Sequence, residues 1–390
     1  MRAAIVGGSL GGLTAALLLH DLGAQVEVYE RSPSELVQRG AGIGFLPDAV
    51  RYLVERAGVS LDRISVATSH IRYLNRRNQV IYDATHRYRF SSWYMVYRQM
   101  LACIDRERYH LGHEMTGWDD GDDAVEVHFA GQASERVDLL VCADGVGSTA
   151  RARLLPEVQP AYSGYVAWRG MVPEAALDEA TRTVLDDAIT YYVYANSHAL
   201  VYPIPGPDGS VTPGERLFNV VWYRNYLAGS DLDDLLTDHT GQRRDTSLPP
   251  GAVSEHHVAE LRAVATSRLP EPIARVVCSV AQPFLQVVYD IDVPRMAFGR
   301  VCLVGDAAFV ARPHAAAGTA KAAADAWALA DAVARHGDVV TALADWEPGQ
   351  LAVGRQLLER TRRIGRRSQV DGNWVPGDPE LIFGLMAPGA

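Results

Sequence analysis

The chain has 390 residues, of which 48% are hydrophobic and 22% charged, and its formal net charge at pH 7 is -10. This is the composition of an ordinary globular protein long enough for two domains, and it excludes the disordered and fibrous classes. The negative balance argues against nucleic-acid binding, which needs a basic surface, so a small molecule is the expected partner.

Local composition excludes two further classes. No stretch reaches the roughly 18 uninterrupted apolar residues of a membrane span, so no membrane partner is expected. The cysteines form no CxxC pair, which predicts neither a metal site nor a disulfide framework and fits a reducing cytoplasm. These cysteines are Cys103, Cys142, Cys278 and Cys302.

The N-terminal segment predicts a strand, a glycine-rich turn, a helix and a second strand. Apolar residues 3–6 precede the turn at 7–12, residues 13–21 have helical character up to Gly23, and residues 26–29 supply the next strand. A right-handed crossover places both strands in one parallel sheet of Rossmann type. Such sheets bind ligands at the carboxyl ends of their strands, where this turn lies.

The turn has the chemistry of a dinucleotide site. Glycines let the backbone approach a pyrophosphate, and the next helix directs its free N-terminal amides at the phosphate oxygens. Ser9 replaces the second glycine of a GxGxxG pattern and is small enough to keep that approach, while Glu30 can accept hydrogen bonds from a ribose. The candidate contacts here are Gly7, Gly8, Ser9, Leu10, Gly12, Glu30 and Arg31.

The residue pattern changes twice in the next part of the chain. Residues 71–90 are polar and aromatic in alternation, which predicts antiparallel strands. Residues 97–101 are expected to begin a helix. Residues 124–129 and 137–142 are expected to form a hairpin leading into Asp144-Gly145, a turn at the end of an apolar strand.

The second half of the chain carries the most specific pattern. Residues 160–288 are rich in aromatic strand patterns and predict an antiparallel sheet that holds a substrate. From Val301 an apolar strand returns and ends in Gly305-Asp306. Pro313-His314 and an alanine-rich segment at 315–330, expected as one helix, follow.

The glycine loop, the Asp-Gly turn and the Gly-Asp motif, in this order and at these separations, resemble the single-component FAD-dependent aromatic-ring monooxygenases with a p-hydroxybenzoate hydroxylase-like fold. The resemblance covers essentially the whole chain. It is narrower still to the hydroxypyridine hydroxylases of that family, through residues 162–170, 202–206, 312–318 and 376–379. One departure is Phe309, which stands where the family usually has a histidine.

The resemblance implies a non-covalent FAD, NADH or NADPH as co-substrate, and O2. In the family, oxygen adds at flavin C4a and its distal atom passes to an electron-rich aromatic or heteroaromatic ring. The absence of a second dinucleotide loop fits a transiently bound nicotinamide coenzyme and leaves the choice between NADH and NADPH open. The family motifs add to the cofactor contacts Gly42 and Ile43 of the loop 40–44, Arg98, Asp144, Gly305, Asp306, Pro313, Gly318 and Thr319.

His314 is the candidate base or hydrogen-bond partner for the substrate hydroxyl, because a neutral histidine suits that role near pH 7 and Pro313 holds it close to the ring. The alternative is that His314 only shapes the loop. Tyr202 is a second catalytic candidate. Trp168, His198 and Tyr223 are candidate substrate contacts on the aromatic strands, with core packing as the alternative for each.

The expected fold is α/β: a discontinuous Rossmann-type FAD-binding domain, a mainly antiparallel substrate domain and a C-terminal helical segment. The FAD-binding domain is expected at 1–70, 93–158 and 291–390, and the substrate domain at 71–92 and 159–290. A homodimer is left open.

Two rival functions share part of the pattern. A flavin-dependent tailoring enzyme, a halogenase or an epoxidase, would share the first loop, but the chain has no Trp-rich halogenase motif and only Lys321 lies near the flavin segment. A non-catalytic flavin-binding protein would need an interaction surface that the sequence does not show. The substrate, the position of oxygenation and any coupled decarboxylation stay open.

Overall fold

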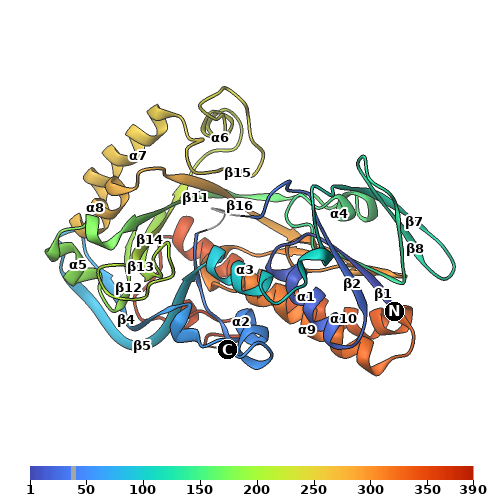
Figure 1. Cartoon of the computed structure of the whole chain (residues 1–390). Coiled ribbons are helices and arrows are strands. Elements are labelled where there is room, and N and C mark those ends of the chain that lie inside the picture. The colour runs from blue at the N-terminus through green and yellow to red at the C-terminus, as the bar shows by residue number, and fades with distance from the viewer. Residues whose placement is uncertain (37–40, 390) are drawn as a thin grey trace.

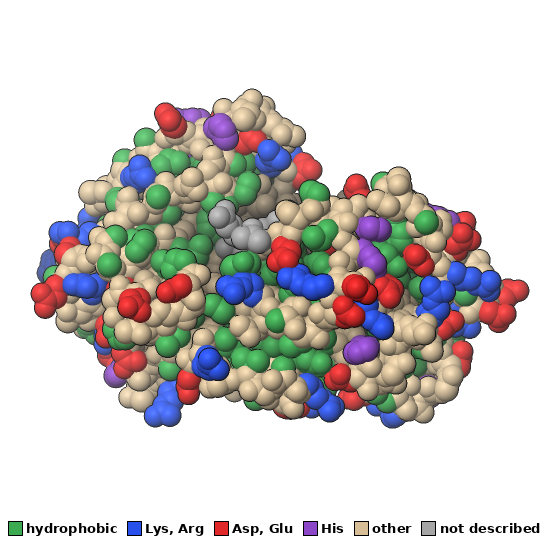
Figure 2. Space-filling model, in the orientation of Figure 1, with side chains coloured by type: hydrophobic (Ala, Val, Ile, Leu, Met, Phe, Trp, Pro, Cys, Tyr) green, Lys and Arg blue, Asp and Glu red, His purple; other side chains and the backbone are tan. Residues whose placement is uncertain are grey.

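The computed structural model describes residues 1–36 and 41–389, which form two large sheets with helices packed on them (Figure 1). Gly40, the first residue of the predicted flavin loop, lies outside the described residues. Acidic and basic side chains are interspersed on the face drawn in Figure 2. Within the described part of the chain, no helix has the length and apolar character that crossing a membrane requires.

The first sheet has six strands and contains the predicted βαβ unit. Its order is β17-β18-β10-β1-β2-β6, and every neighbouring pair is parallel except β17 with β18. The central strands are buried, as expected for a parallel sheet covered on both faces. The strands are β1 (Arg2–Val6), β2 (Gln25–Glu30), β6 (Tyr109–Leu111), β10 (Leu139–Cys142), β17 (Ala297–Phe298) and β18 (Val301–Leu303).

Helices on one side and a small antiparallel sheet on the other pack around this parallel sheet (Figure 1). The helices are α1 (Leu10–Asp21), α2 (Pro47–Glu55), α3 (Trp93–Leu101), α9 (Gly318–Arg335) and α10 (Val339–Gln369), and α4 (Thr149–Leu154) follows β10. The small sheet comprises β7 (Met115–Asp120), β8 (Val125–Phe129) and β9 (Glu135–Val137).

The second sheet is mainly antiparallel, as predicted, with one parallel pair between β12 and β4. Its order is β15-β16-β11-β14-β13-β12-β4-β5-β3, and β19 pairs with β16. The strands are β3 (Gly42–Gly44), β4 (Val66–Leu74), β5 (Val80–Ser92), β11 (Ala161–Pro173), β12 (Ala188–Tyr194), β13 (Ser197–Ile204), β14 (Leu217–Asn225), β15 (Ser247–Leu248), β16 (Phe284–Asp292) and β19 (Phe309–Val310).

The two faces of this second sheet serve different purposes. The outer face packs on α5 (Glu179–Leu185), α7 (Glu255–Arg268) and α8 (Glu271–Ser279), with α6 (Ser230–Leu235) nearby (Figure 1). The inner face looks toward the parallel sheet. Because side chains alternate along a strand, Trp168 points into the outer core while Ala167 and Arg169 point inward.

Three of the expected elements differ in the structure. Residues 97–101 end a helix instead of beginning one, since the Ser92 side chain caps α3 by accepting a hydrogen bond from the Met95 amide at 3.1 Å. Residues 139–142 join the parallel sheet as β10, while β8 pairs with β9. The alanine-rich helix begins at Gly318, because Ala316 adopts a left-handed conformation with φ 53°.

The C-terminal segment returns to the inner face of the second sheet. After α10, the Trp374 indole donates to the Tyr73 hydroxyl at 3.2 Å and the Phe383 amide to the Tyr88 hydroxyl at 3.0 Å. Arg360 of α10 donates to the Gly384 carbonyl at 2.6 Å. These contacts hold aromatic side chains of the tail against the space between the two sheets.

Candidate functional site

Two adjoining cavities lie between the sheets, at the carboxyl ends of the parallel strands. The larger has a volume of about 540 Å³ and the smaller about 340 Å³. Their walls share Ser9, Trp93, Ala143, Gly145 and Gln286, so together they form one channel from the parallel sheet to the inner face of the antiparallel one.

The loop at 7–12 can take this shape only with glycine at positions 7, 8 and 12. A Cβ on Gly12 would lie 1.9 Å from the Gly7 carbonyl oxygen, and one on Gly8 would lie 2.1 Å from the Tyr109 hydroxyl. Gly7 has φ 106°, which favours glycine. Ser9 precedes α1 without a side-chain cap, so the first amides of the helix remain available to an anion.

Glu30 lies in the smaller cavity and is partly satisfied by backbone. Its carboxylate accepts from the Gly8 and Ser32 amides, each at 2.9 Å. A carboxylate offers about four acceptor sites, so two remain for a diol. Arg31 lines the same cavity. The site therefore fits the ribose of an adenosine.

Asp144, at the end of β10, also lines the smaller cavity. Its Oδ2 accepts from the Ala150 amide at 3.2 Å, whereas Oδ1 is buried without a partner among the described residues. Burial raises the pKa of this carboxyl. A buried oxygen without a donor is costly, which fits a bound ligand that supplies one.

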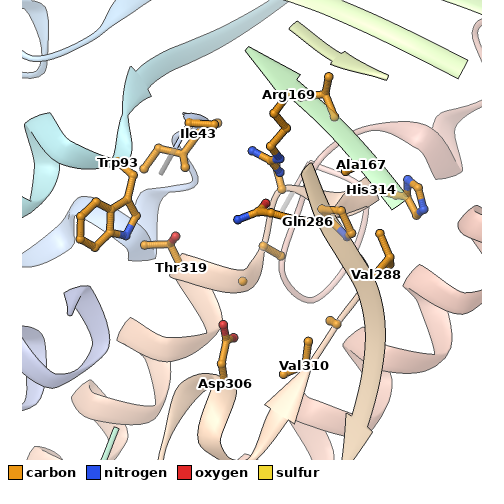
Figure 3. Close-up of a pocket in the computed structure, with 18 of the residues that line it drawn as sticks. Ile43, Trp93, Ala167, Arg169, Gln286, Val288, Asp306, Val310, His314 and Thr319 are labelled. Atoms are coloured by element: carbon orange, nitrogen blue, oxygen red, sulfur yellow. The ribbon is translucent and has the colours of Figure 1, made fainter. Parts of the chain in front are cut away.

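The Gly305-Asp306 turn is held by a buried ion pair in α9. The Lys321 ammonium lies 2.6 Å from Asp325 Oδ2, which also accepts from the Gly305 amide at 2.8 Å. Asp306 projects into the larger cavity, at the opposite end from Arg169 (Figure 3). Although its side chain is exposed to the open cavity, desolvation by the surrounding protein raises the pKa of Asp306 to about 6, against the opposing effects of Lys321 and Arg151.

The N-terminus of α9 faces the same cavity. Ala317 provides no side-chain cap, and Gly318, Thr319 and Pro313 line the wall. The free amides and the positive end of the helix dipole would stabilise negative charge on a reduced flavin ring. Together with the glycine loop, Glu30 and Asp144, this arrangement fits an extended FAD.

The opposite wall is formed by tyrosines and one histidine of the second sheet, together with His314 from the turn before α9. Tyr202, Tyr223, His198 and His314 line the larger cavity and are almost fully buried. Tyr202 stacks on Phe90 with ring centroids 4.2 Å apart. The His198 and Tyr223 centroids lie 4.5 Å apart, and those of Tyr223 and His314 lie 4.8 Å apart. We call Tyr202, Tyr223, His198 and His314 the aromatic cage.

Both histidines are anchored from behind. Nε2 of His314 lies 2.7 Å from the Tyr165 hydroxyl, and Nδ1 of His198 is hydrogen bonded to the Ser368 hydroxyl. Burial lowers the pKa of His198 to about 3 and that of His314 well below its ordinary value, the latter with contributions from His198 and Arg312. Each imidazole is therefore neutral near pH 7.

The structure brings most of the sequence-predicted residues to this channel. Gly42 donates its amide to Asn219 Oδ1 at 2.8 Å, which brings the flavin loop against β14. Gly8 and Gly12 shape the loop without being among the lining residues. The predicted residues that line one or both cavities are Gly7, Ser9, Leu10, Glu30, Arg31, Gly42, Ile43, Asp144, His198, Tyr202, Tyr223, Gly305, Asp306, Pro313, His314, Gly318 and Thr319.

Two predicted contacts lie elsewhere. Trp168 belongs to the outer core, where its indole donates to the Tyr226 hydroxyl at 3.3 Å, because its strand turns that position away from the cavity. Arg98 is exposed on α3, with its guanidinium 5.8 Å from the Tyr94 ring, and lines neither cavity.

Sequence reasoning also missed four residues of the site. Arg169 and Gln286 extend into the larger cavity, and Trp93 lies across it beside Ile43 (Figure 3). Tyr165 is the hydroxyl partner of His314. For Arg169 and Tyr165 a signal existed, since each is an odd number of residues from Trp168 on the same strand and thus faces the other side.

The chain is similar to known flavoprotein hydroxylases. Residues 162–290 match the family model "FAD binding domain-like". The chain is 38% identical over 385 residues to 2,6-dihydroxypyridine 3-monooxygenase of Paenarthrobacter nicotinovorans, covering 98% of this chain and 96% of that protein. It is 28% identical to 3-amino-4-hydroxybenzoate 2-monooxygenase of Streptomyces cremeus, covering 97% of this chain and 89% of the other.

A solved structure agrees with these matches. The 2,6-dihydroxypyridine-3-hydroxylase of Arthrobacter nicotinovorans superposes with a TM-score of 0.93 at 37% identity, over 98% of this chain and 96% of that one. The matches run through both sheets and the tail. The chain therefore belongs to the FAD-dependent aromatic-ring monooxygenases, enzymes that use FAD, NAD(P)H and O2 to hydroxylate an aromatic ring.

Proposed function

We propose that the ring hydroxylated by this enzyme is a hydroxypyridine or a similarly small phenol. The observation that carries the proposal is the 38% identity, across 98% of the chain, to an enzyme named for 2,6-dihydroxypyridine. The cage supports it, since its tyrosines and histidines offer hydrogen bonds around a flat space. A halogenase would place a lysine at the flavin tunnel, but Lys321, the chain's single lysine, is buried against Asp325.

We place the substrate ring over Val221 and Leu200 of the inner face. These two aliphatic residues are directly paired across β14 and β13, and both line the larger cavity. Tyr223 and His198 pair with each other on one side of them, and Tyr202 stands on the other. FAD, when bound, supplies the activation of oxygen, and the protein excludes water from the ring and orients it.

His314 is the proposed acceptor of the proton from the substrate hydroxyl. When its Nε2 donates to Tyr165, Nδ1 is left as an acceptor, and this atom has no partner among the described residues. Tyr165 then fixes the tautomer and the ring orientation. Tyr202 is the second proposed catalytic group, as a hydrogen-bond partner of the substrate.

The proposal is tested with the flavin-loaded enzyme and NADH or NADPH. Substrate-stimulated coenzyme oxidation is screened with 2,6-dihydroxypyridine, 6-hydroxynicotinate and 4-hydroxybenzoate, and the product is identified by mass spectrometry. A hydroxylated pyridine is the expected product. Coenzyme oxidation that yields only hydrogen peroxide with every ring would contradict it.

The role of His314 is tested with His314→Gln, in which flavin reduction and product yield are measured separately. We expect reduction to continue while the rate of ring hydroxylation falls about 100-fold or more, as removal of a general base typically costs, so that the yield of hydroxylated product per coenzyme falls as well. An unchanged yield and pH profile would remove His314 from the mechanism.

We also propose that the chain divides into two domains, that the protein is located in the cytoplasm and that it forms a homodimer. The four cysteines support a reducing location, since all are free thiols. The exposed apolar side chains of Val80 and Ile81 are neighbours at the start of β5 and support a dimer, because contiguous exposed apolar groups often mark an interaction site. Light scattering on the purified holoenzyme tests the dimer, and a monomer at all concentrations would refute it.

A further inference from the structure

One charged side chain in the larger cavity has no role in the arrangement described so far. Arg169 is the only lysine or arginine among the described residues that line this cavity. Its Nε is buried and has no hydrogen-bond partner within residues 1–36 and 41–389. By contrast, the buried Arg216 and the part-buried Arg312 each lie 2.8 Å from a carboxylate oxygen, of Glu174 and Asp290 respectively.

A partly buried guanidinium without an anionic partner destabilises the protein unless a ligand supplies that partner. Partly buried arginines are ordinarily paired, because removal of a charge from water must be offset by a partner of opposite charge. Asp306, the acid on the wall of the same cavity, lies at the opposite end (Figure 3). Arg169 therefore presents an uncompensated positive charge to whatever occupies the space between.

The register of the sheet places Arg169 at the edge of the proposed ring position. Arg169 pairs with Val221 on β14, Val221 with Leu200 on β13, and Leu200 with Tyr191 on β12. Neighbouring strands lie about 4.8 Å apart, so in this row the apolar side chains of Val221 and Leu200 lie between the cation at one end and the tyrosine at the other. A six-membered ring placed over Val221 and Leu200 therefore has the substituents at one edge close to the guanidinium group.

The electrostatics of the cage agree with this placement. Burial raises the pKa of both Tyr202 and Tyr223, and Arg169 is the neighbour whose charge acts to lower them. The two histidines are neutral near pH 7. Among the described side chains of this wall, Arg169 thus supplies the positive charge that can hold an ionised oxygen on the ring.

We propose that Arg169 binds an anionic oxygen of the substrate ring, so that the site selects rings carrying an ionised hydroxyl group over neutral rings of the same shape. This inference rests on the proposed function, since it assigns the charge of the ring that is hydroxylated. An ionised ring is also richer in electrons, which favours attack by an electrophilic oxygen. Arg169 would then serve both selection and reactivity.

The test compares two probes that differ in their ability to ionise. The dissociation constants of 2,6-dihydroxypyridine and 2,6-dimethoxypyridine are measured on the holoenzyme, without coenzyme, from the change in flavin absorbance. Loss of one partner of a buried charge pair costs about 30-fold or more in affinity. We therefore expect the wild type to prefer the dihydroxy ring by at least about 30-fold, and Arg169→Gln to reduce that preference to roughly threefold or less.

Two further variants serve as controls. Arg169→Lys keeps the charge without the planar fork and should keep at least about a third of the preference, roughly tenfold or more, which is clearly above the value expected for Arg169→Gln. Arg77→Gln, the same loss of charge at an exposed turn between β4 and β5, should bind both probes like the wild type. Should Arg169→Gln fail to hold flavin, Arg169→Lys decides: a preference that disappears although the charge is kept overturns the proposal.

The outcomes separate this inference from the proposed function. A wild type that binds both probes equally, or an Arg169→Gln protein that keeps the full preference, overturns the role of Arg169 even if the enzyme hydroxylates pyridines. A strong preference that Arg169→Gln abolishes supports that role even if turnover shows that another ring is the substrate.

Discussion

The two walls of the channel are built in different ways. The nucleotide side is made of backbone: glycine turns at the ends of parallel strands, with the free amides of α1 and α9 directed inward. The ring side is made of side chains that alternate along antiparallel strands, with Tyr202, Tyr223 and His198 on the inner face. A site made of backbone restricts which residues can form it, whereas a site made of side chains can be changed one residue at a time.

The strongest test of the backbone wall is Gly12→Val. Its Cβ would lie 1.9 Å from the Gly7 carbonyl, so the turn must open. We expect FAD affinity to fall by roughly 100-fold or more, since the pyrophosphate loses its cradle. Bound flavin after desalting measures the loss, and thermal unfolding shows whether the fold survives. Gly349→Ala, which meets open space in α10, is the matched control and should retain FAD. Full flavin content in Gly12→Val would show that the tight turn is not required.

A second prediction concerns Asp306 and the dependence of FAD affinity on pH. The pKa of Asp306 is raised to about 6, chiefly by desolvation, so the carboxylate that can accept hydrogen bonds from FAD becomes protonated below that pH. FAD affinity of the wild type should therefore be level above pH 6 and fall by up to about tenfold per pH unit below it. In Asp306→Asn, affinity should be weaker at pH 8 but insensitive to pH. Titration of flavin-depleted protein by fluorescence quenching measures both curves, and parallel curves for the two proteins would contradict the assignment.

A third prediction concerns His198, on the ring side of the channel, and the dependence of the free energy of unfolding on pH. Burial lowers its pKa to about 3 in the fold, while the unfolded chain takes up a proton near 6.5. Between these values the unfolded state binds more protons, so stability falls as pH falls, by roughly 1.4 kcal/mol per pH unit. His198→Gln should lose less stability than the wild type between pH 6.5 and pH 5. Urea unfolding of both proteins at one FAD concentration measures the difference, and equal slopes would show that His198 is not buried as a neutral group.

The same contrast explains what the sequence could predict. The glycine turns, Glu30 and Asp306 follow from local pattern, because a backbone that approaches a phosphate needs glycine at fixed spacing. The placement of Trp168 failed because an aromatic strand pattern does not reveal which face of a strand meets the ligand and which meets α7 and α8. Both faces are apolar here, so the alternation of polar and apolar residues that would settle the question is absent.

Long-range contacts were the second limit. The hydrogen bond between Tyr165 and His314 joins residues 149 apart in the chain, and that between His198 and Ser368 joins residues 170 apart. Each depends on how α10 and the turn before α9 pack on the second sheet. Nothing in the local sequence of either partner specifies the other, so only the folded chain shows these pairs.

The smallest expected effect belongs to Arg98, where the sequence pattern and the structure disagree. The family motif predicts that this arginine contacts FAD, whereas its side chain is exposed on α3 and lines neither cavity. Because an exposed arginine without a ligand contributes little, Arg98→Gln should change the FAD dissociation constant by less than about threefold. Fluorescence titration beside Gly12→Val and the wild type measures this on one scale. A loss of tenfold or more would mean that Arg98 swings into the channel when FAD binds, and that the nucleotide wall also depends on a side chain that its backbone signature does not reveal.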